Sequence, residues 1–143
     1  AELAPSQASA RAHVALRLGD FALARSELDR VQDLPAEDLY WRLYRLTAGC
    51  RTGELRTAYP PLDTQSWPNA LIEFHCGRAS EEEVFFKANT VERRAEAHFQ
   101  LGALNLGANA LAARDHFERT VALAPPSFVE HAAARQELTR WTL

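Results

Sequence analysis

The chain has 143 residues, 47% of them hydrophobic and 24% charged, and a formal net charge of -3. This length and composition are those of a single globular domain, and they exclude a disordered chain. With so little net charge and no basic tract, the sequence predicts no nucleic-acid partner. It contains no apolar run of about 18 residues, so it also predicts no transmembrane segment.

The first part of the chain repeats with a period of 34 residues, which separates Gly19 from Gly53 and Asp20 from Glu54. Each Gly-acidic pair stands between two amphipathic stretches. Gly accepts the backbone conformation that ends a helix, and the acidic residue favours the start of the next one. We therefore expect two helical hairpins, at about residues 6–34 and 36–59. A helix-corner-helix unit of this period is typical of tetratricopeptide repeats (TPR).

Residues 60–90 are expected to be irregular. The prolines of YPPLDTQSWP, Pro68 among them, predict a non-helical segment, because proline has no N–H and restricts the residue before it. A short helix is expected at NALIEFHCG. The next stretch, SEEEVFFKA, begins with a helix-start signal in which Ser80 is followed by Glu83 three residues later.

A third hairpin is predicted at residues 91–124, in the stretch AEAHFQLGALNLGANALAARDHFERTVALAP. Gly102 is costly inside a helix, so it indicates a place where two helices cross closely. Asn109 stands where the acidic corner residue is expected, and Pro125 stands at the end of the second helix. The remaining segment, at about 127–142, is expected to form one helix that caps the last hairpin.

These elements predict an all-α fold: a single TPR-like domain over residues 1–143, arranged as a short α-solenoid of about nine helices with a C-terminal capping helix. The apolar spacing predicts which side chains form the core. The expected buried residues are Leu28, Leu46, Leu101, Phe117 and Val121.

The sequence predicts no enzyme, no cofactor and no metal site, because it has no GxSxG, P-loop, GxGxxG or HExxH motif. His75 and Cys76 are neighbours, but adjacent helical residues point about 100 degrees apart and do not face each other. Cys50 and Cys76 have no zinc-site spacing. The sequence leaves two interpretations of these cysteines open: two free thiols, or one disulfide between them.

The candidate binding residues are the inner row of the first helix of each hairpin, which lines the concave surface of a helical stack. Aromatic residues and Arg are the types that most often dominate interface energies. Trp41 and Tyr44 have an alternative interpretation as core residues beneath the irregular loop. The predicted partner-binding residues are Ser9, His13, Trp41, Tyr44, Arg51, Phe99, Ala103 and Leu106.

A carboxylate clamp of the kind that binds chaperone C-termini is not expected on this row. Such a clamp needs Lys, Asn and Arg, and the corresponding positions carry Ser9, His13, Arg45, Glu96 and Gln100.

The stretches LIEFHCGRASEEEVFFKA and FVEHAAARQEL, with the third hairpin between them, resemble the C-terminal half of NlpI-like TPR lipoproteins of Gram-negative bacteria. The FVEH tetrad at residues 128–131 is the most specific part. The resemblance implies a dimeric periplasmic adaptor, anchored to the outer membrane, whose partners are a periplasmic protease and cell-wall enzymes. The chain lacks the lipid-bearing Cys and the signal sequence of such proteins and is interpreted as a processed or trimmed chain. A cytoplasmic location is the alternative.

Two functional hypotheses follow. The first is a non-enzymatic adaptor or scaffold that binds a segment of a partner protein on its concave helical surface. The second is a structural module that forms a homodimer through its N-terminal helix, where Ala8, Ala12 and Ala15 fall near one stripe and permit close approach of a second copy.

Overall fold

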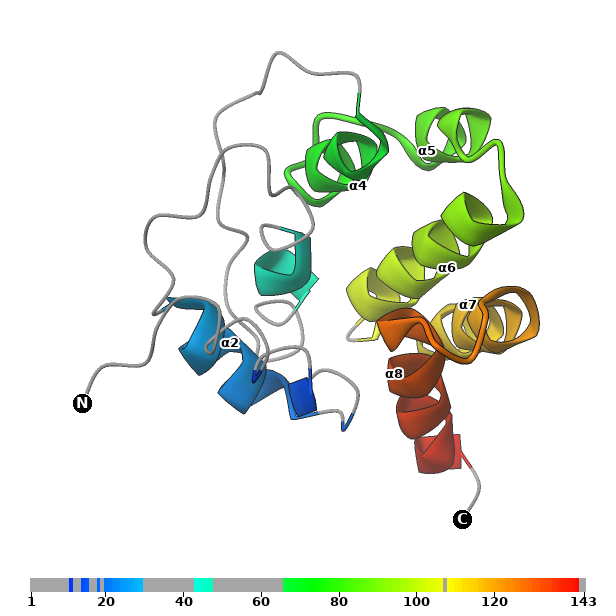
Figure 1. Cartoon of the computed structure of the whole chain (residues 1–143). Helices are drawn as coiled ribbons and strands as arrows, with labels where there is room; N and C mark the ends of the chain where they lie inside the picture. The colour runs from blue at the N-terminus through cyan, green and yellow to red at the C-terminus, as the bar shows by residue number, and fades with distance from the viewer. Residues whose placement is uncertain are drawn as a thin grey trace.

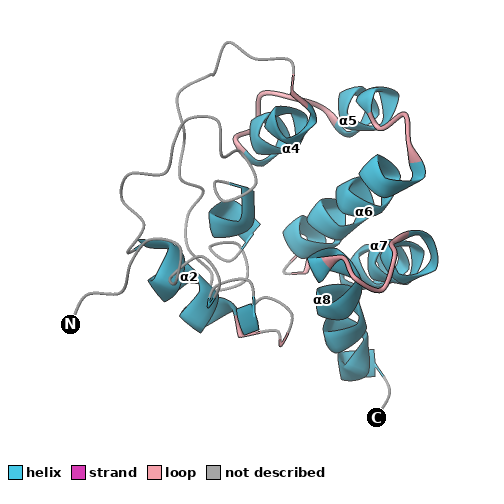
Figure 2. Ribbon diagram, in the orientation of Figure 1, coloured by secondary structure: helices cyan, strands magenta, loops and turns pink. Residues whose placement is uncertain are grey.

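The computed structural model describes residues 11, 14, 15, 18, 20–29, 43–47, 66–106 and 108–141, and every regular element in these ranges is helical (Figures 1 and 2). The predicted all-α class is confirmed for this part of the chain. The elements in chain order are α2 (Phe21–Asp29), a helical stretch at 43–47, α4 (Trp67–His75), α5 (Glu81–Lys87), α6 (Val91–Asn105), α7 (Ala110–Leu123), α8 (Val129–Leu138) and the 3-10 turn η1 (Thr139–Trp141).

Helix α2 begins at the predicted acidic corner. The Asp20 carboxylate accepts a hydrogen bond from the Leu23 backbone N–H at 3.1 Å, which satisfies one of the donors that a helix leaves open at its N-terminus. The preceding turn is closed by a bond from the Asp20 N–H to the Ala15 carbonyl at 2.8 Å. The acidic residue therefore caps α2, as its position in the sequence indicates.

Helix α4 begins earlier than the sequence predicts. Trp67 and Pro68 were expected in a non-helical segment, and this expectation is wrong because both lie in the first turn of α4. Proline is tolerated there, since the first N–H groups of a helix have no partner within the helix and the fixed φ of proline suits the turn. This shift places the Trp67 side chain on a helix that faces α5 and α6.

Helix α5 carries the predicted start signal in full. The Ser80 hydroxyl accepts from the Glu83 N–H at 3.1 Å, and the Glu83 carboxylate accepts from the Ser80 N–H at 3.4 Å. This reciprocal capping box, together with three acidic residues in the first turn and Lys87 in the last, suits the helix dipole at both ends.

Helices α6 and α7 form the hairpin predicted in this region. The Asn109 side chain caps α7 by accepting from the Ala112 N–H at 3.1 Å. A Cβ atom added at Gly102 would lie 2.7 Å from Cε1 of Phe117, so the two helices approach as closely as the glycine predicts. Helix α7 ends before Pro125, and α8 then returns along the hairpin.

The described core has two parts, with α6 contributing to both. One cluster joins the 43–47 stretch, α4, α5 and Ala97 of α6. The other lies among α6, α7 and α8 and is built from Phe99, Ala113, Phe117, Ala133 and Ala134. In Figure 1, α6, α7 and α8 lie together, and α4 and α5 lie on the opposite side of α6 from α7 and α8.

The predicted core residues are largely buried. Leu46, Leu101 and Phe117 are between 0% and 4% exposed. Val121 differs, because it is only half-buried at the edge of the second cluster. The side chain of Leu28 lies outside the described residues. No helix in the described ranges is both long enough and apolar enough to cross a membrane.

Candidate functional site

A cavity lies between α4, α5 and the start of α6. It has a volume of about 420 Å³, within the range of roughly 300–1,000 Å³ that is usual for ligand pockets. Its lining residues are Ser66, Trp67, Asn69, Ala70, Glu73, Arg78, Ala79, Glu83, Val84, Phe86, Lys87, Asn89 and Arg93.

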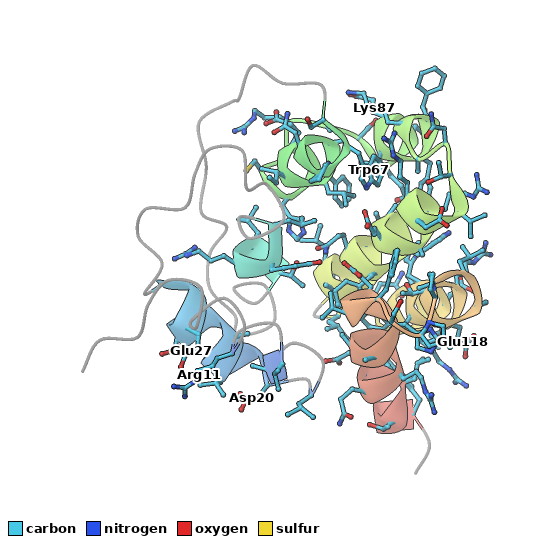
Figure 3. All side chains as sticks on the ribbon, in the orientation of Figure 1. Arg11, Asp20, Glu27, Trp67, Lys87 and Glu118 are labelled. Atoms are coloured by element: carbon cyan, nitrogen blue, oxygen red, sulfur yellow. The ribbon has the colours of Figure 1, made fainter. Side chains whose placement is uncertain are left out.

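The base of this α4–α5 pocket is formed by apolar core residues, while most of its exposed lining is polar. Trp67, Ala70 and Val84 are at most 8% exposed and belong to the first core cluster. Trp67 also donates its indole N–H to the Glu96 carboxylate of α6. Figure 3 shows Trp67 directed into the space between α4, α5 and α6. Burial of the ring and the bond from its N–H hold Trp67 rigidly at the base of the pocket.

The rim combines an exposed aromatic ring with cations. Phe86 is 87% exposed, although burying such a side chain is worth about 1.5–3 kcal/mol. Lys87, next to it, is also exposed and projects at the top of α5 in Figure 3. The guanidinium of Arg93 lies 5.5 Å from the centre of the Trp67 ring, a separation suited to a cation–π contact.

One ion pair closes the end of the pocket next to the turn after α4. Arg78 donates to Glu73 through two bonds, from Nε at 2.7 Å and from Nη2 at 2.8 Å. The hydrogen bonding from Arg78 is the main reason why the pKa of Glu73 lies below its usual value; burial acts in the opposite direction, and the charges of Arg78 and Lys87 add to the lowering. This carboxylate is therefore already neutralised by a partner of its own.

Two histidines meet between α6 and α7, outside the pocket. His98 and His116 place their Nδ1 atoms 3.0 Å apart, and Phe85 of α5 lies against the His98 ring with centroids 4.9 Å apart. One ring donates and the other accepts, so the bond requires an Nδ1–H on one imidazole and an unprotonated Nδ1 on the other. The sequence did not predict this pair, because the two residues are 18 positions apart.

Burial is the largest influence on both imidazoles. It lowers the pKa of His98 to about 4, assisted by the charges of His116 and Arg119 and opposed by Asp115. Burial also lowers the pKa of His116, against the carboxylates of Glu81 and Asp115. Both rings are therefore neutral near pH 7, the state in which they bond to each other.

A cluster of three polar side chains joins α4, α6 and the 43–47 stretch. Oε1 of Gln100 lies 2.7 Å from Nε2 of His75 and 2.7 Å from the hydroxyl of Thr47. His75, Gln100 and Thr47 are all 0% exposed. These side chains hold three helical segments together inside the core, and no substrate can reach His75 without opening it.

The structure brings part of the predicted binding row together, but in the interior. Phe99 and Ala103 are 3% and 5% exposed, and the Phe99 ring packs 5.8 Å from that of Phe117. Leu106 is half-buried against the same cluster. In the isolated chain these three do not form an open groove wall, because α7 and α8 cover them.

Tyr44 also lies in the interior. It is 9% exposed, and its hydroxyl donates to the buried carboxylate of Glu130 on α8 at 3.1 Å. This placement agrees with the alternative interpretation of Tyr44 as a core residue. The other predicted binding residues, Ser9, His13, Trp41 and Arg51, lie outside the described residues.

The sequence interpretation missed the pocket residues Trp67, Phe86, Lys87 and Arg93. Trp67 gives no usable signal in the sequence, because Pro68 disfavours a helical conformation in the residue before it. Phe86 had a usable signal: adjacent helical residues point about 100 degrees apart, so Phe85 and Phe86 cannot both face one core. The structure turns Phe85 inward, toward His98, and leaves Phe86 in solvent.

The described residues contain no group of three or more His, Cys, Asp or Glu side chains that could hold a metal ion. Cys76 is half-buried at the end of α4. Cys50 lies outside the described residues, so both interpretations of the cysteines remain predictions.

No protein-family model, curated protein or solved structure matches this chain.

Proposed function

We propose that this chain is a non-enzymatic adaptor that binds a segment of a partner protein, with the α4–α5 pocket as the contact site. One observation carries the proposal: the 87% exposed Phe86 stands at the rim of a pocket whose floor is the buried ring of Trp67. An aromatic anchor beside a concave apolar floor is the arrangement that a short segment of another protein can fill.

The described polar clusters support binding over catalysis. His75 is held by Gln100 in the core, and His98 and His116 hold each other across the α6–α7 hairpin. A general base must lie within hydrogen-bond reach of a proton on its substrate. These imidazoles instead contribute to packing between helices, which is what a rigid binding scaffold requires.

The finer fold assignment is part of the same proposal. The α6–α7 hairpin, with its close approach at Gly102 and its Asn109 cap, supports a short TPR-type solenoid with α8 as the capping helix. The role of an NlpI-like envelope adaptor in the periplasm, with a protease or cell-wall enzymes as partners, is proposed from the sequence resemblance alone.

The test is affinity capture from native extract with three baits: wild type, Phe86→Ser and Leu111→Ser. Leu111 is a matched control, because it is apolar and 77% exposed but lies on α7, outside the pocket. We expect a partner that wild type and Leu111→Ser retain and that Phe86→Ser loses. Equal capture by all three baits would show that the pocket is not the contact site.

A second candidate, self-association, is favoured by an apolar patch near the N-terminus. Val14, Leu18 and Leu23 are 56%, 67% and 39% exposed and line a cavity of about 310 Å³. Ala15, from the stripe predicted to meet a second copy, is only 2% exposed. Sedimentation of wild type and Leu18→Ser tests this candidate: a monomer at micromolar concentration for wild type removes it, and a dimer lost in the variant supports it.

A further inference from the structure

The charges on the α4–α5 pocket differ from those of the chain as a whole. The chain has a net charge of -3, yet the pocket lining contains the cations Arg78, Lys87 and Arg93 and only two carboxylates, Glu73 and Glu83. Charges separated by more than a Debye length, about 8–10 Å in ordinary buffers, are largely screened. The Glu96 carboxylate, bonded to Trp67, also lies within this range, so the groups that attract a ligand at contact distance are the charged side chains without a bonded partner of opposite charge.

Both carboxylates of the lining are engaged within the chain. Glu73 is held by the two hydrogen bonds from Arg78. Glu83 accepts from the Ser80 N–H and hydroxyl in the capping box of α5. Among the described residues, neither carboxylate forms a hydrogen bond or an ion pair with Lys87 or Arg93.

Arg93 is oriented without being neutralised. Its Nη1 donates to the Asn89 side chain at 3.1 Å and to the Lys87 carbonyl at 3.4 Å, and its guanidinium lies over Trp67. All three partners are uncharged. Since the side chain is already ordered, a carboxylate that binds it costs less conformational entropy than one that must order a free Arg.

Lys87 adds a second positive charge beside Arg93. It is the basic residue of the last turn of α5, and the described part of the chain provides no ion pair for it. Phe86 precedes it and is exposed on the same rim. The rim therefore presents two cations that have no direct ion pair among the described residues, next to the exposed ring of Phe86.

We propose that the pocket binds an acidic segment of the partner protein, in which an Asp or Glu side chain pairs with Arg93 and Lys87 and an apolar side chain packs against Phe86. This inference rests on the proposed adaptor function. The charge complementarity selects an acidic segment over a basic one, and the exposed ring of Phe86 favours a protein segment over a small anion.

The test is selection of a random peptide library against the full chain, with wild type compared with Lys87→Glu, Phe86→Ser and Arg94→Glu. Arg94→Glu makes the same charge change as Lys87→Glu at an exposed neighbouring position of α6 that does not line the pocket. Circular dichroism and thermal melting confirm that each variant is folded.

We expect wild type and Arg94→Glu to select peptides enriched in Asp or Glu beside an apolar residue. For a selected peptide, Lys87→Glu should weaken binding by about threefold to tenfold, the effect of losing and then opposing one exposed ion pair. Added salt should weaken wild-type binding and have less effect on the variant.

The outcomes separate this inference from the function on which it rests. Two outcomes would overturn the inference that the segment is acidic and leave the adaptor function in place. In the first, the selected peptides depend on Phe86 but are not enriched in Asp or Glu. In the second, Lys87→Glu and Arg94→Glu weaken peptide binding equally. A library from which wild type selects nothing would contradict both. Binding to phosphatidylserine vesicles without selection of acidic peptides would reassign the surface to membrane contact and overturn the inference.

Discussion

Phenylalanine is buried in one helical interface of this chain and exposed beside another. The first interface, the seam, lies among α6, α7 and α8, and the second lies between α4 and α5. In the seam, Phe117 is 1% exposed and lies so close to α6 that a Cβ atom at Gly102 would contact it at 2.7 Å. Between α4 and α5, Phe86 is 87% exposed at the edge of a cavity of about 420 Å³. The chain thus packs the core of one helical interface closely and leaves an aromatic ring beside the other exposed.

The largest expected difference is between the two phenylalanines themselves. Phe117→Ala should lower the free energy of unfolding by about 3–5 kcal/mol, because it removes a buried ring and leaves a cavity. Phe86→Ala should change it by about 0.5 kcal/mol or less, as at an ordinary surface position. Denaturant unfolding measures both. Similar losses for the two variants would mean that Phe86 is buried in solution.

A smaller effect is expected at the closest point of the seam. Gly102→Ala should lower the free energy of unfolding by about 1–3 kcal/mol, because the added methyl group overlaps the Phe117 ring. At an open helical position the same change would stabilise by about 0.5–1 kcal/mol. The control is Gly102→Ala combined with Phe117→Leu, in which part of the clash is relieved. Stabilisation by Gly102→Ala alone would refute the close approach.

The helix caps allow a comparison of local stability in the two regions. Ser80→Ala beside the pocket and Asn109→Ala beside the seam each remove one capping side chain and should each cost about 0.5–2 kcal/mol. Hydrogen exchange should show faster exchange of the Glu83 amide in the first variant and of the Ala112 amide in the second. Unchanged exchange at either amide would contradict that cap.

The histidine pair makes the seam sensitive to pH without affecting it near pH 7. The pKa of His98 is lowered to about 4 and that of His116 is also lowered, so between about pH 6.5 and 4 the unfolded chain binds protons that the folded chain does not. Stability should therefore fall as the pH drops through this window.

Thermal melting from pH 7 to pH 4 measures this contribution. The double variant His98→Gln, His116→Gln should lose less stability over the window than wild type, since it has no imidazoles to protonate in the unfolded state. An equal loss in both proteins would assign the acid sensitivity to other groups.

The sequence by itself determined the features that depend on neighbouring residues. The Ser80–Glu83 capping box, the Asp20 and Asn109 caps and the small residue at the α6–α7 crossing follow from local backbone chemistry, which acts over a single helical turn. Apolar periodicity likewise indicated the helices and the burial of Leu101 and Phe117.

Only the tertiary structure decided which of these surfaces are open. Phe85 and Phe86 are adjacent and identical residues, yet the position of α6 leaves Phe85 half-buried against His98 and Phe86 exposed. The same holds for Tyr44, which looked suited to a groove and instead bonds Glu130 on α8. The distance and angle between helices distant in sequence set these outcomes, and helical periodicity defines a face without defining what packs on it.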